Sequence, residues 1–325
     1  MPDLYIPVSD IISQLNLALD MRDIVRLVAA TENHQPVEWA AVKSIYENGC
    51  NSRNRNGSLR NLSDTAINPE VLERFPNGVA VMGDPSFLNA MVRDAIDGTG
   101  IGHWASDVVR GKILSKAILA IVYGEVLEEL NTARAKLRER QTGDERGAPH
   151  NVDKAWASYV GAFDGLGNRP YAISHIAMEI EREFGLENKI DIPVQRAIGM
   201  ALASSRKGYV GTFLSAMDQT RGYLNAVFYL GALGSLNKAV AEYDSVNREI
   251  HLADGWGFFQ TIRPAVASIS VEAGDITQAA YSSSPSKPIS KQIIRGVYKA
   301  LNDPVVLKGL LIPGDLLVQA HRILG

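Results

Sequence analysis

Cysteine is nearly missing from this sequence, since Cys50 is the single one among 325 residues. One cysteine excludes an intramolecular disulfide, and it excludes every zinc or iron–sulfur site that is built from several thiolates. Aromatic residues are also few, at 7%, whereas hydrophobic residues reach 46% and charged residues 21%. That apolar fraction can form a sizeable core, so a largely disordered chain is excluded as well.

An excess of charge of one sign is also absent. Lysine and arginine number 33 and aspartate and glutamate number 36, which gives a formal net charge of −3. Nucleic-acid binding depends on clustered cations that neutralise phosphates, so no nucleic-acid partner is expected. The most apolar stretch, residues 113–130, contains Lys116 and Glu125. It falls short of the roughly 20 apolar residues that cross a bilayer, so no membrane span is expected either.

The first twenty residues do not have the pattern of a signal peptide. They contain no basic segment, no long apolar segment and no cleavage site of small residues. The sequence is therefore compatible with a cytoplasmic protein or with the mature form of a periplasmic or secreted protein. It carries no indication of oligomeric state.

Hydrophobic periodicity predicts helices along most of the chain. In residues 36–48, for example, Trp39, Val42 and Tyr46 recur at helical spacing, and Gly49 ends the segment. No alternating run is long enough for a sheet, so we predict an all-α fold, a multi-helix bundle in one domain over residues 1–325. Further helices are expected at residues 84–95, 103–130, 151–163, 170–184, 193–203, 217–243, 246–267 with a bend at Pro264, 289–301 and 313–324.

Polar segments between these helices predict loops at residues 50–64 and 282–288, and a frayed helix end followed by a surface loop at residues 131–149. There is also a weak internal repeat. The segments HNVDKAW, which starts at His150, and HLADGW, which starts at His251, each combine a histidine, a carboxylate three residues later and a tryptophan. This repeat is compatible with two related helical halves, residues 1–145 and 146–325.

Histidines are few, but four of the six have a carboxylate one helical turn downstream. Residues three or four apart share a helix face, so each pair could present an imidazole and a carboxylate to one metal ion. Such ligands suit iron, manganese or zinc. The same pairs also fit a structural role, in which the carboxylate caps a helix or orients a buried imidazole. The pairs are His103 with Asp107, His150 with Asp153, His175 with Glu179, and His251 with Asp254.

Three longer segments together resemble a known family. They are IYENGCNSRNRNGSLRNL at residues 45–62, GAPHNVDKAWASYVG at residues 147–161, and ADGWGFFQTIRPAVA at residues 253–267. In this order they resemble the low-iron-inducible, iron-assimilating periplasmic proteins of green algae, which are also described as high-CO2-inducible. A more distant architectural likeness is to the imelysin-like helical bundles, although their G-x-H-x-x-E motif is not reproduced around His103.

The resemblance implies an all-helical protein that binds iron during iron acquisition. It points to His150 in the second segment, to Glu47 in the first and to Asp254 in the third, where the family typically has glutamate. The sequence departs from the algal proteins because it has no evident signal peptide and almost no cysteine. The other candidate ligands rest on spacing alone and are His103, Asp107, Asp153, His175 and Glu179.

These observations lead to one hypothesis and two alternatives. The hypothesis is a protein of iron acquisition or homeostasis whose metal partner, expected to be iron, with manganese or zinc as alternatives, is held by histidines and carboxylates from at least three helices. Its affinity for metal should fall below about pH 6.5, where an ordinary imidazole becomes protonated. The alternatives are an iron-dependent enzyme of oxygen or hydrolytic chemistry on the same bundle, and a helical interaction module without metal.

Overall fold

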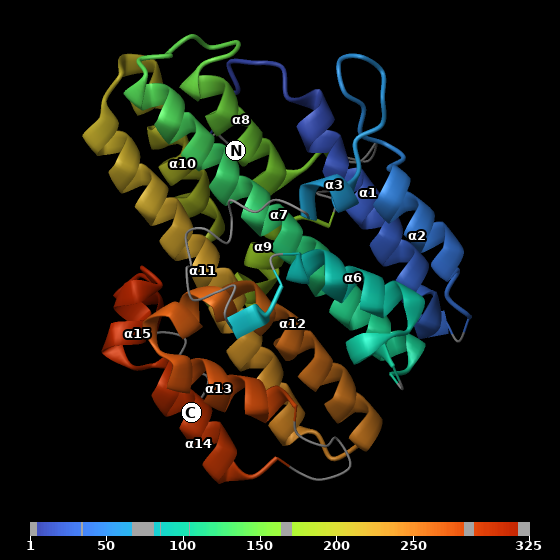
Figure 1. The fold of residues 1–325 in the computed structure, drawn as a ribbon. Coiled ribbons are helices and arrows are strands. Elements are labelled where there is room, and N and C mark those ends of the chain that lie inside the picture. The colour runs from blue at the N-terminus through green and yellow to red at the C-terminus, as the bar shows by residue number, and fades with distance from the viewer. Residues whose placement is uncertain are drawn as a thin grey trace.

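A computed structural model of the chain describes residues 5–33, 35–66, 81–84, 86–103, 105–163, 171–282 and 289–317. Within these residues every extended regular element is a helix, and β-pairing is limited to an isolated bridge between Arg53 and Leu59. The predicted all-α multi-helix bundle is thus confirmed (Figure 1). In the described part of the chain, no helix combines the length and apolarity needed to cross a bilayer.

Two helices of 32 residues each, α7 (Asp107–Arg138) and α11 (Val210–Ala241), organise the bundle. Shorter helices pack around them. They are α1 (Ile12–Val28), α2 (Trp39–Asn48), α3 (Leu62–Ala66), α6 (Phe87–Asp97), α8 (Ala148–Val160), α9 (Ile173–Glu183), α10 (Asp191–Lys207), α12 (Ser245–Ile269), α13 (Val271–Tyr281), α14 (Lys291–Leu301), α15 (Pro304–Gly309), and the 3-10 helices Ala29–Asn33 and Gly100–Gly102.

Helix α7 lies at the centre because its apolar residues wrap most of its circumference. It contacts α1 and α6 on one side, α8 and α11 on another, and α12 along its N-terminal half, where Lys116 pairs with Asp254 (Figure 1). A helix that is apolar all round can be buried on every side, and every residue of α7 from Ile113 to Leu127 is buried. The loop between α2 and α3 and the start of α8 lie together at the top of Figure 1.

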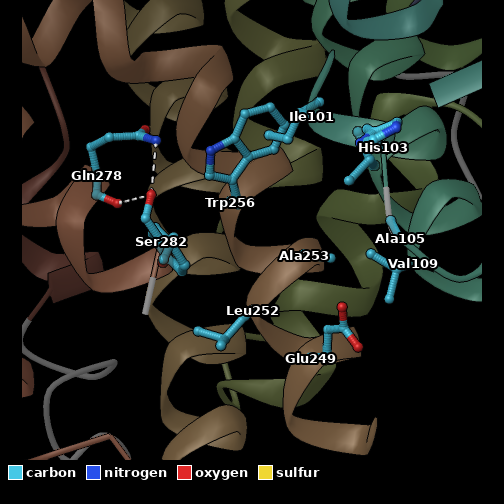
Figure 2. Close-up of a pocket in the computed structure, with 12 residues that line it drawn as sticks. Ile101, His103, Ala105, Val109, Glu249, Leu252, Ala253, Trp256, Gln278 and Ser282 are labelled. Atoms are coloured by element: carbon cyan, nitrogen blue, oxygen red, sulfur yellow. Dashed lines mark hydrogen bonds between the residues drawn. The ribbon is translucent and has the colours of Figure 1, made fainter. Parts of the chain in front are cut away.

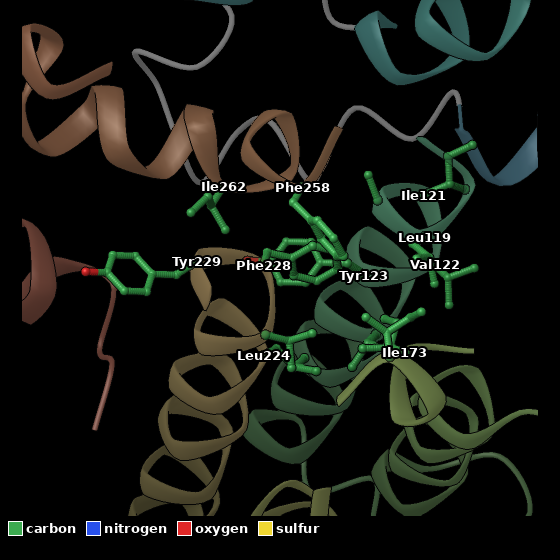
Figure 3. Close-up of a cluster of buried hydrophobic side chains, with 14 of the residues drawn as sticks. Leu119, Ile121, Val122, Tyr123, Ile173, Leu224, Phe228, Tyr229, Phe258 and Ile262 are labelled. Atoms are coloured by element: carbon green, nitrogen blue, oxygen red, sulfur yellow. The ribbon is translucent and has the colours of Figure 1, made fainter. Parts of the chain in front are cut away.

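The core where α7, α11 and α12 meet is aromatic (Figure 3). Tyr123 of α7 packs edge to face on Phe228 of α11, with ring centroids 5.1 Å apart, and Phe228 continues to Phe258 of α12 at 6.3 Å. Gly231 makes this approach possible, because a Cβ atom at its position would lie 2.8 Å from the Phe258 ring. Such edge-to-face pairs add about 0.5–1.5 kcal/mol each beyond the area they bury.

The helix bounds differ from the predicted ones where contacts with other helices determine where a helix ends. Helix α7 continues to Arg138, beyond the predicted fraying at residue 131, because Ala133 and Leu137 are buried. Pro264 lies inside α12, within the predicted helix. Helices α1, α3, α13 and α15 were not predicted, and α3 begins at Leu62, within the predicted loop at residues 50–64. The predicted loop at residues 282–288 and the helix at residues 313–324 fall largely outside the described residues.

Candidate functional site

A cavity of about 470 Å³ opens where the start of α1, the α2–α3 loop and the first turns of α8 meet. We call it the N-terminal pocket. Its walls come from three segments that are far apart in the sequence, so the fold and not local sequence assembles it. Its lining residues are Asp10, Ile11, Ile12, Ser13, Gln14, Arg53, Asn54, Arg55, Arg60, His150 and Lys154.

The imidazole of His150 is held by a chain of hydrogen bonds that ends on a fully buried carboxylate. Its Nδ1 lies 2.8 Å from Ser9 Oγ, and Ser9 Oγ donates to Asp153 Oδ2 at 2.7 Å. The single hydroxyl proton of Ser9 is used in that bond, so Nδ1 of a neutral His150 must donate to Ser9. The lone pair of the imidazole is then on Nε2, the nitrogen that a metal ion or a hydrogen-bond donor can approach.

Asp153 ties the N-terminal segment to α8. It is 0% exposed and accepts hydrogen bonds from the Tyr5 hydroxyl at 2.7 Å and the Val8 amide at 2.9 Å, in addition to Ser9. Tyr5 also stacks on Trp156, one turn further along α8, with ring centroids 4.7 Å apart. Burial, followed by the charge of Asp153, raises the pKa of Tyr5, so this phenol stays protonated and remains a donor.

The floor of the N-terminal pocket is a buried polar network. Arg60 forms an ion pair with Glu125 of α7 and donates to Gln14 of α1, and Gln14 donates to Ser158 at 2.7 Å. Beside it Lys154 pairs with Glu129 at 3.0 Å. Two cations of the pocket therefore have carboxylate partners beneath them, which fixes their position.

The α2–α3 loop is polar, yet it is ordered by contacts with α1. Asp20 is 0% exposed and accepts hydrogen bonds from the Asn51 amide at 2.7 Å and from Asn51 Nδ2 at 2.8 Å. Burial raises the pKa of Asp20, and the hydrogen bonds from Asn51 oppose that shift. The loop is thereby fixed at its start, and Arg53, Arg55 and Arg60 project from a defined position.

Gly49, at the start of the α2–α3 loop, packs directly against the backbone of Arg60 near the end of the same loop. Its φ is +71°, and a Cβ atom there would overlap the carbonyl oxygen of Arg60. Gly49→Ala is expected to lower the free energy of unfolding, measured by urea denaturation, by about 2–3 kcal/mol. Gly57→Ala is the matched control, because Gly57 has φ +85° but open space at its Cβ position. Equal losses in the two variants would contradict the contact with Arg60.

The electrostatic environment of His150 is positive. Burial lowers the pKa of His150, and Lys154, Lys136 and Arg55 lower it further, in that order, with Asp153 opposing them. A histidine in this environment is neutral at physiological pH. It therefore offers Nε2 as an acceptor or metal ligand and not as a cation.

Two predicted ligands of the N-terminal half form other contacts. Glu47 of α2 pairs with Arg93 of α6 at 3.0 Å. Asp107, at the start of α7, accepts hydrogen bonds from Trp39 Nε1 at 3.0 Å and from Arg110 at 3.1 Å. Through these contacts Glu47 links α2 to α6, and Asp107 links α7 to α2.

Three further candidate ligands lie outside the N-terminal pocket. Asp254 of α12 forms an ion pair with Lys116 of α7 at 2.9 Å. His175 and Glu179 of α9 contact each other at 3.4 Å, and both are more than one third exposed. His175 and Glu179 therefore lie close together, as their i,i+4 spacing predicts, and they form a single pair at the surface of α9.

His103 lines a second cavity, of about 310 Å³, between the Gly100–Gly102 turn, α7, α12 and α13 (Figure 2). The cavity is largely apolar. Trp256 lies beside Ile101. Gln278 and Ser282, four residues apart, form one edge, where the serine hydroxyl donates to the backbone carbonyl of Gln278 at 3.0 Å. Glu249 lies at another edge. This cavity brings His103 near the ADGW segment but supplies no cluster of ligands around it.

Among the residues that the structure describes, no three histidine, cysteine, aspartate or glutamate side chains are grouped so that they could hold a metal ion. The expectation of one site with protein ligands from at least three helices is therefore not met there. Asp153, Asp107 and Asp254 are used in hydrogen bonds or ion pairs with serine, tyrosine, tryptophan, arginine or lysine partners. Of the eight predicted ligands, His150 lines the N-terminal pocket and Asp153 supports it.

The cationic part of the pocket was missed by the sequence reasoning. Arg53, Arg55 and Arg60 all lie in the first of the three family-like segments, and Lys154 lies in the second. Their presence in both segments was a usable signal. The sequence predicts only a polar loop at residues 50–64, because nothing in one sequence shows that residues 53–60 and 150–154 face the same cavity.

Comparison with known families gives one match. The sequence profile of a family described as low iron-inducible periplasmic protein matches residues 3–182. No curated protein and no solved structure matches the chain. Every residue that lines the N-terminal pocket lies inside the matched segment, whereas the second cavity takes Glu249, Trp256, Gln278 and other residues from beyond it. The N-terminal pocket therefore lies entirely within the segment that the family profile matches, and the second cavity lies only partly within it.

Proposed function

Because the chain belongs to the low iron-inducible periplasmic protein family, we propose that it takes part in iron assimilation by binding iron in the N-terminal pocket. The family description supplies the link to iron. The pocket is favoured because two of the three family-like segments, residues 45–62 and 147–161, converge on it.

The observation that carries this proposal is the hydrogen-bond chain from Asp153 through Ser9 to His150. Metal-binding histidines generally donate their second ring nitrogen to an outer partner, which fixes the tautomer and the ring orientation. Here that partner is Ser9, held in turn by Asp153. The arrangement leaves the lone pair on Nε2, in the plane of the ring, on a histidine that lines the N-terminal pocket.

The donor set favours iron with mainly oxygen ligands. His150 contributes one nitrogen and Asp10 one carboxylate to the pocket lining. Thiolate is not available, because Cys50 does not line the cavity. Imidazole and oxygen donors suit iron, and most of the coordination positions would be filled by oxygen atoms that do not belong to the protein.

Binding is better supported than catalysis at this site. An iron-dependent enzyme would require an apolar substrate pocket beside the metal. The N-terminal pocket is lined mainly by charged and polar side chains, with Ile11 and Ile12 as its apolar residues. Such a lining fits capture and release of a charged species.

His150→Ala is expected to weaken iron binding about 100-fold, because it removes the oriented nitrogen ligand. The measurement is titration of untagged protein with iron, combined with elemental analysis of the purified protein. His175→Ala is the matched control, since His175 is exposed and paired with Glu179 away from the pocket. Its iron affinity and the thermal melting temperatures of both variants should equal those of the wild type. Unchanged affinity in His150→Ala would contradict the proposal.

The pH dependence of iron binding follows from the lowered pKa of His150. Binding needs the neutral imidazole, so affinity is retained above the pKa of the free protein and lost as pH falls through it. Because that pKa is below its ordinary value of about 6.5, the loss should begin at lower pH than for an ordinary histidine. The measurement is the ratio of wild-type to His150→Ala affinity between pH 7.5 and pH 4.5. A ratio that declines already above pH 6.5 would contradict it.

A further inference from the structure

We propose that iron enters the N-terminal pocket as an anionic complex with a polycarboxylate, whose carboxylate groups pair with Arg53 and Arg55 while His150 binds the metal. This inference rests on the proposed function and names the form of iron that the pocket selects. It starts from the charge of the lining, which holds the four cations Arg53, Arg55, Arg60 and Lys154 and the single carboxylate Asp10.

Of the four cations, Arg53 and Arg55 have guanidinium N–H groups that are available to a ligand. Arg60 and Lys154 already pair with Glu125 and Glu129. Arg53, in contrast, donates to the carbonyl of Gly57 at 3.2 Å, a bond that leaves most of its guanidinium N–H groups for other acceptors.

Arg55 is 64% exposed and lies 3.9 Å from both Asp10 and Glu145, which is longer than a direct hydrogen bond. The guanidinium groups of Arg53 and Arg55 therefore stand at the pocket with their planar N–H pairs available. That geometry matches carboxylate oxygens, which accept two parallel bonds from one guanidinium.

The backbone adds to the positive field. Residues 11–14, at the N-terminal end of α1, line the pocket, and the cap residue Ile11 provides no side-chain acceptor for the first turn. Asp10 accepts from the Ile12 amide at 3.2 Å. The first turn of α1 thus borders the cavity, and the positive end of a helix dipole favours an anion by about 0.3–1 kcal/mol.

This field disfavours an uncomplexed iron cation. The imidazole of His150 lines the same cavity as the four cations. The same charges repel a bare ion at Nε2 and attract a complex whose net charge is negative. A polycarboxylate that wraps iron supplies both the oxygen ligands and the negative charge.

The space fits such a complex. A cavity of about 470 Å³ is within the range of small-ligand sites. Binding is a ligand exchange without redox change: the Nε2 lone pair forms a bond to iron, one water leaves the metal, and the peripheral carboxylates pair with Arg53 and Arg55. The carboxylates set the orientation, and His150 distinguishes the iron complex from the free acid.

The test compares three probes by titration: ferric citrate, citrate alone, and ferrous iron supplied anaerobically without citrate. The variant Arg53→Gln/Arg55→Gln should bind ferric citrate about tenfold or more weakly than the wild type, which corresponds to about 1.4 kcal/mol. The control Arg93→Gln/Arg295→Gln removes the same charge at exposed positions away from the pocket and should bind as the wild type does. Wild-type affinity for ferric citrate should exceed that for citrate alone and fall with added salt.

Two results would overturn the inference. One is equal affinity for ferric citrate in both double variants, and the other is binding of free citrate as tight as that of its iron complex. If the inference alone fails, iron without citrate still binds and still depends on His150. If the proposed function fails, His150→Ala changes the binding of neither form of iron.

Discussion

Replacing Asp153 with alanine is expected to lower the free energy of unfolding by about 3–5 kcal/mol and to release the N-terminal segment. The carboxylate is fully buried and accepts from Tyr5, Val8 and Ser9. Its removal leaves donors without an acceptor in a buried position, at a cost of about 1–3 kcal/mol for each unsatisfied group. Urea denaturation measures the stability, and hydrogen exchange of the amides in residues 5–11 measures the release.

A control variant distinguishes the loss of stability caused by removing Asp153 from that caused by removing a surface carboxylate. Asp144→Ala is the control, because Asp144 is about one third exposed and pairs with Arg206 in an exposed ion pair. Exposed pairs contribute about 0–1 kcal/mol. A loss for Asp153→Ala no larger than the loss for Asp144→Ala would show that the N-terminal segment is not held by this carboxylate.

Lys116→Met is expected to cost about 3 kcal/mol, because it leaves Asp254 in a partly buried position without its counter-ion. Burial alone would lower the pKa of Lys116, but Asp254 raises it above the ordinary value, so the pair is ionised in the folded protein. The lysine also lies over the Phe258 ring, with Nζ 4.7 Å from its centroid. The measurement is chemical denaturation of the single variants and of Lys116→Met/Asp254→Leu.

The double variant should recover most of the stability that Lys116→Met loses, because no unpaired charge then remains. Lys238→Met is a control of the same chemistry, since Lys238 pairs with Glu183 at 2.7 Å in an exposed position. It should change stability by less than about 1 kcal/mol. If the double variant is less stable than Lys116→Met, the pair contributes through packing or hydrogen bonds that its charge does not explain. Neither variant should change iron binding at His150.

Helix positions were predictable where local patterns determine them. Residues 36–48 carry an apolar face at helical spacing and end at Gly49, and the observed helix α2 is Trp39–Asn48. The end of α7 was not predictable in the same way, because the polar residues after position 130 hide the burial of Ala133 and Leu137 against neighbouring helices. Tertiary packing thus extends a helix beyond the point where local composition predicts its end.

The candidate site could be predicted only in part. His150 was identified through the family-like segment that contains it, and it lines the N-terminal pocket. Its support from Ser9 joins residues 141 positions apart, which no local spacing reveals. The i,i+3 rule instead paired His150 with Asp153 directly, whereas the structure inserts the Ser9 hydroxyl between them.

The partners of the predicted carboxylate ligands could not be predicted for a related reason. Spacing shows that a histidine and a carboxylate share a helix face, but it does not show whether a side chain from another helix pairs with the carboxylate. Lys116 of α7 pairs with Asp254, and Arg93 of α6 pairs with Glu47. Since the chain contains 33 lysines and arginines, such competition is expected.

The most direct measurement is an anomalous difference map from crystals of the iron-loaded protein, recorded at the iron absorption edge. We expect one strong peak in the N-terminal pocket, within bonding distance of His150 Nε2, and no peak there in crystals of His150→Ala treated in the same way. A peak at His175 and Glu179, or at any position outside the pocket while the pocket is empty, would contradict iron binding by His150.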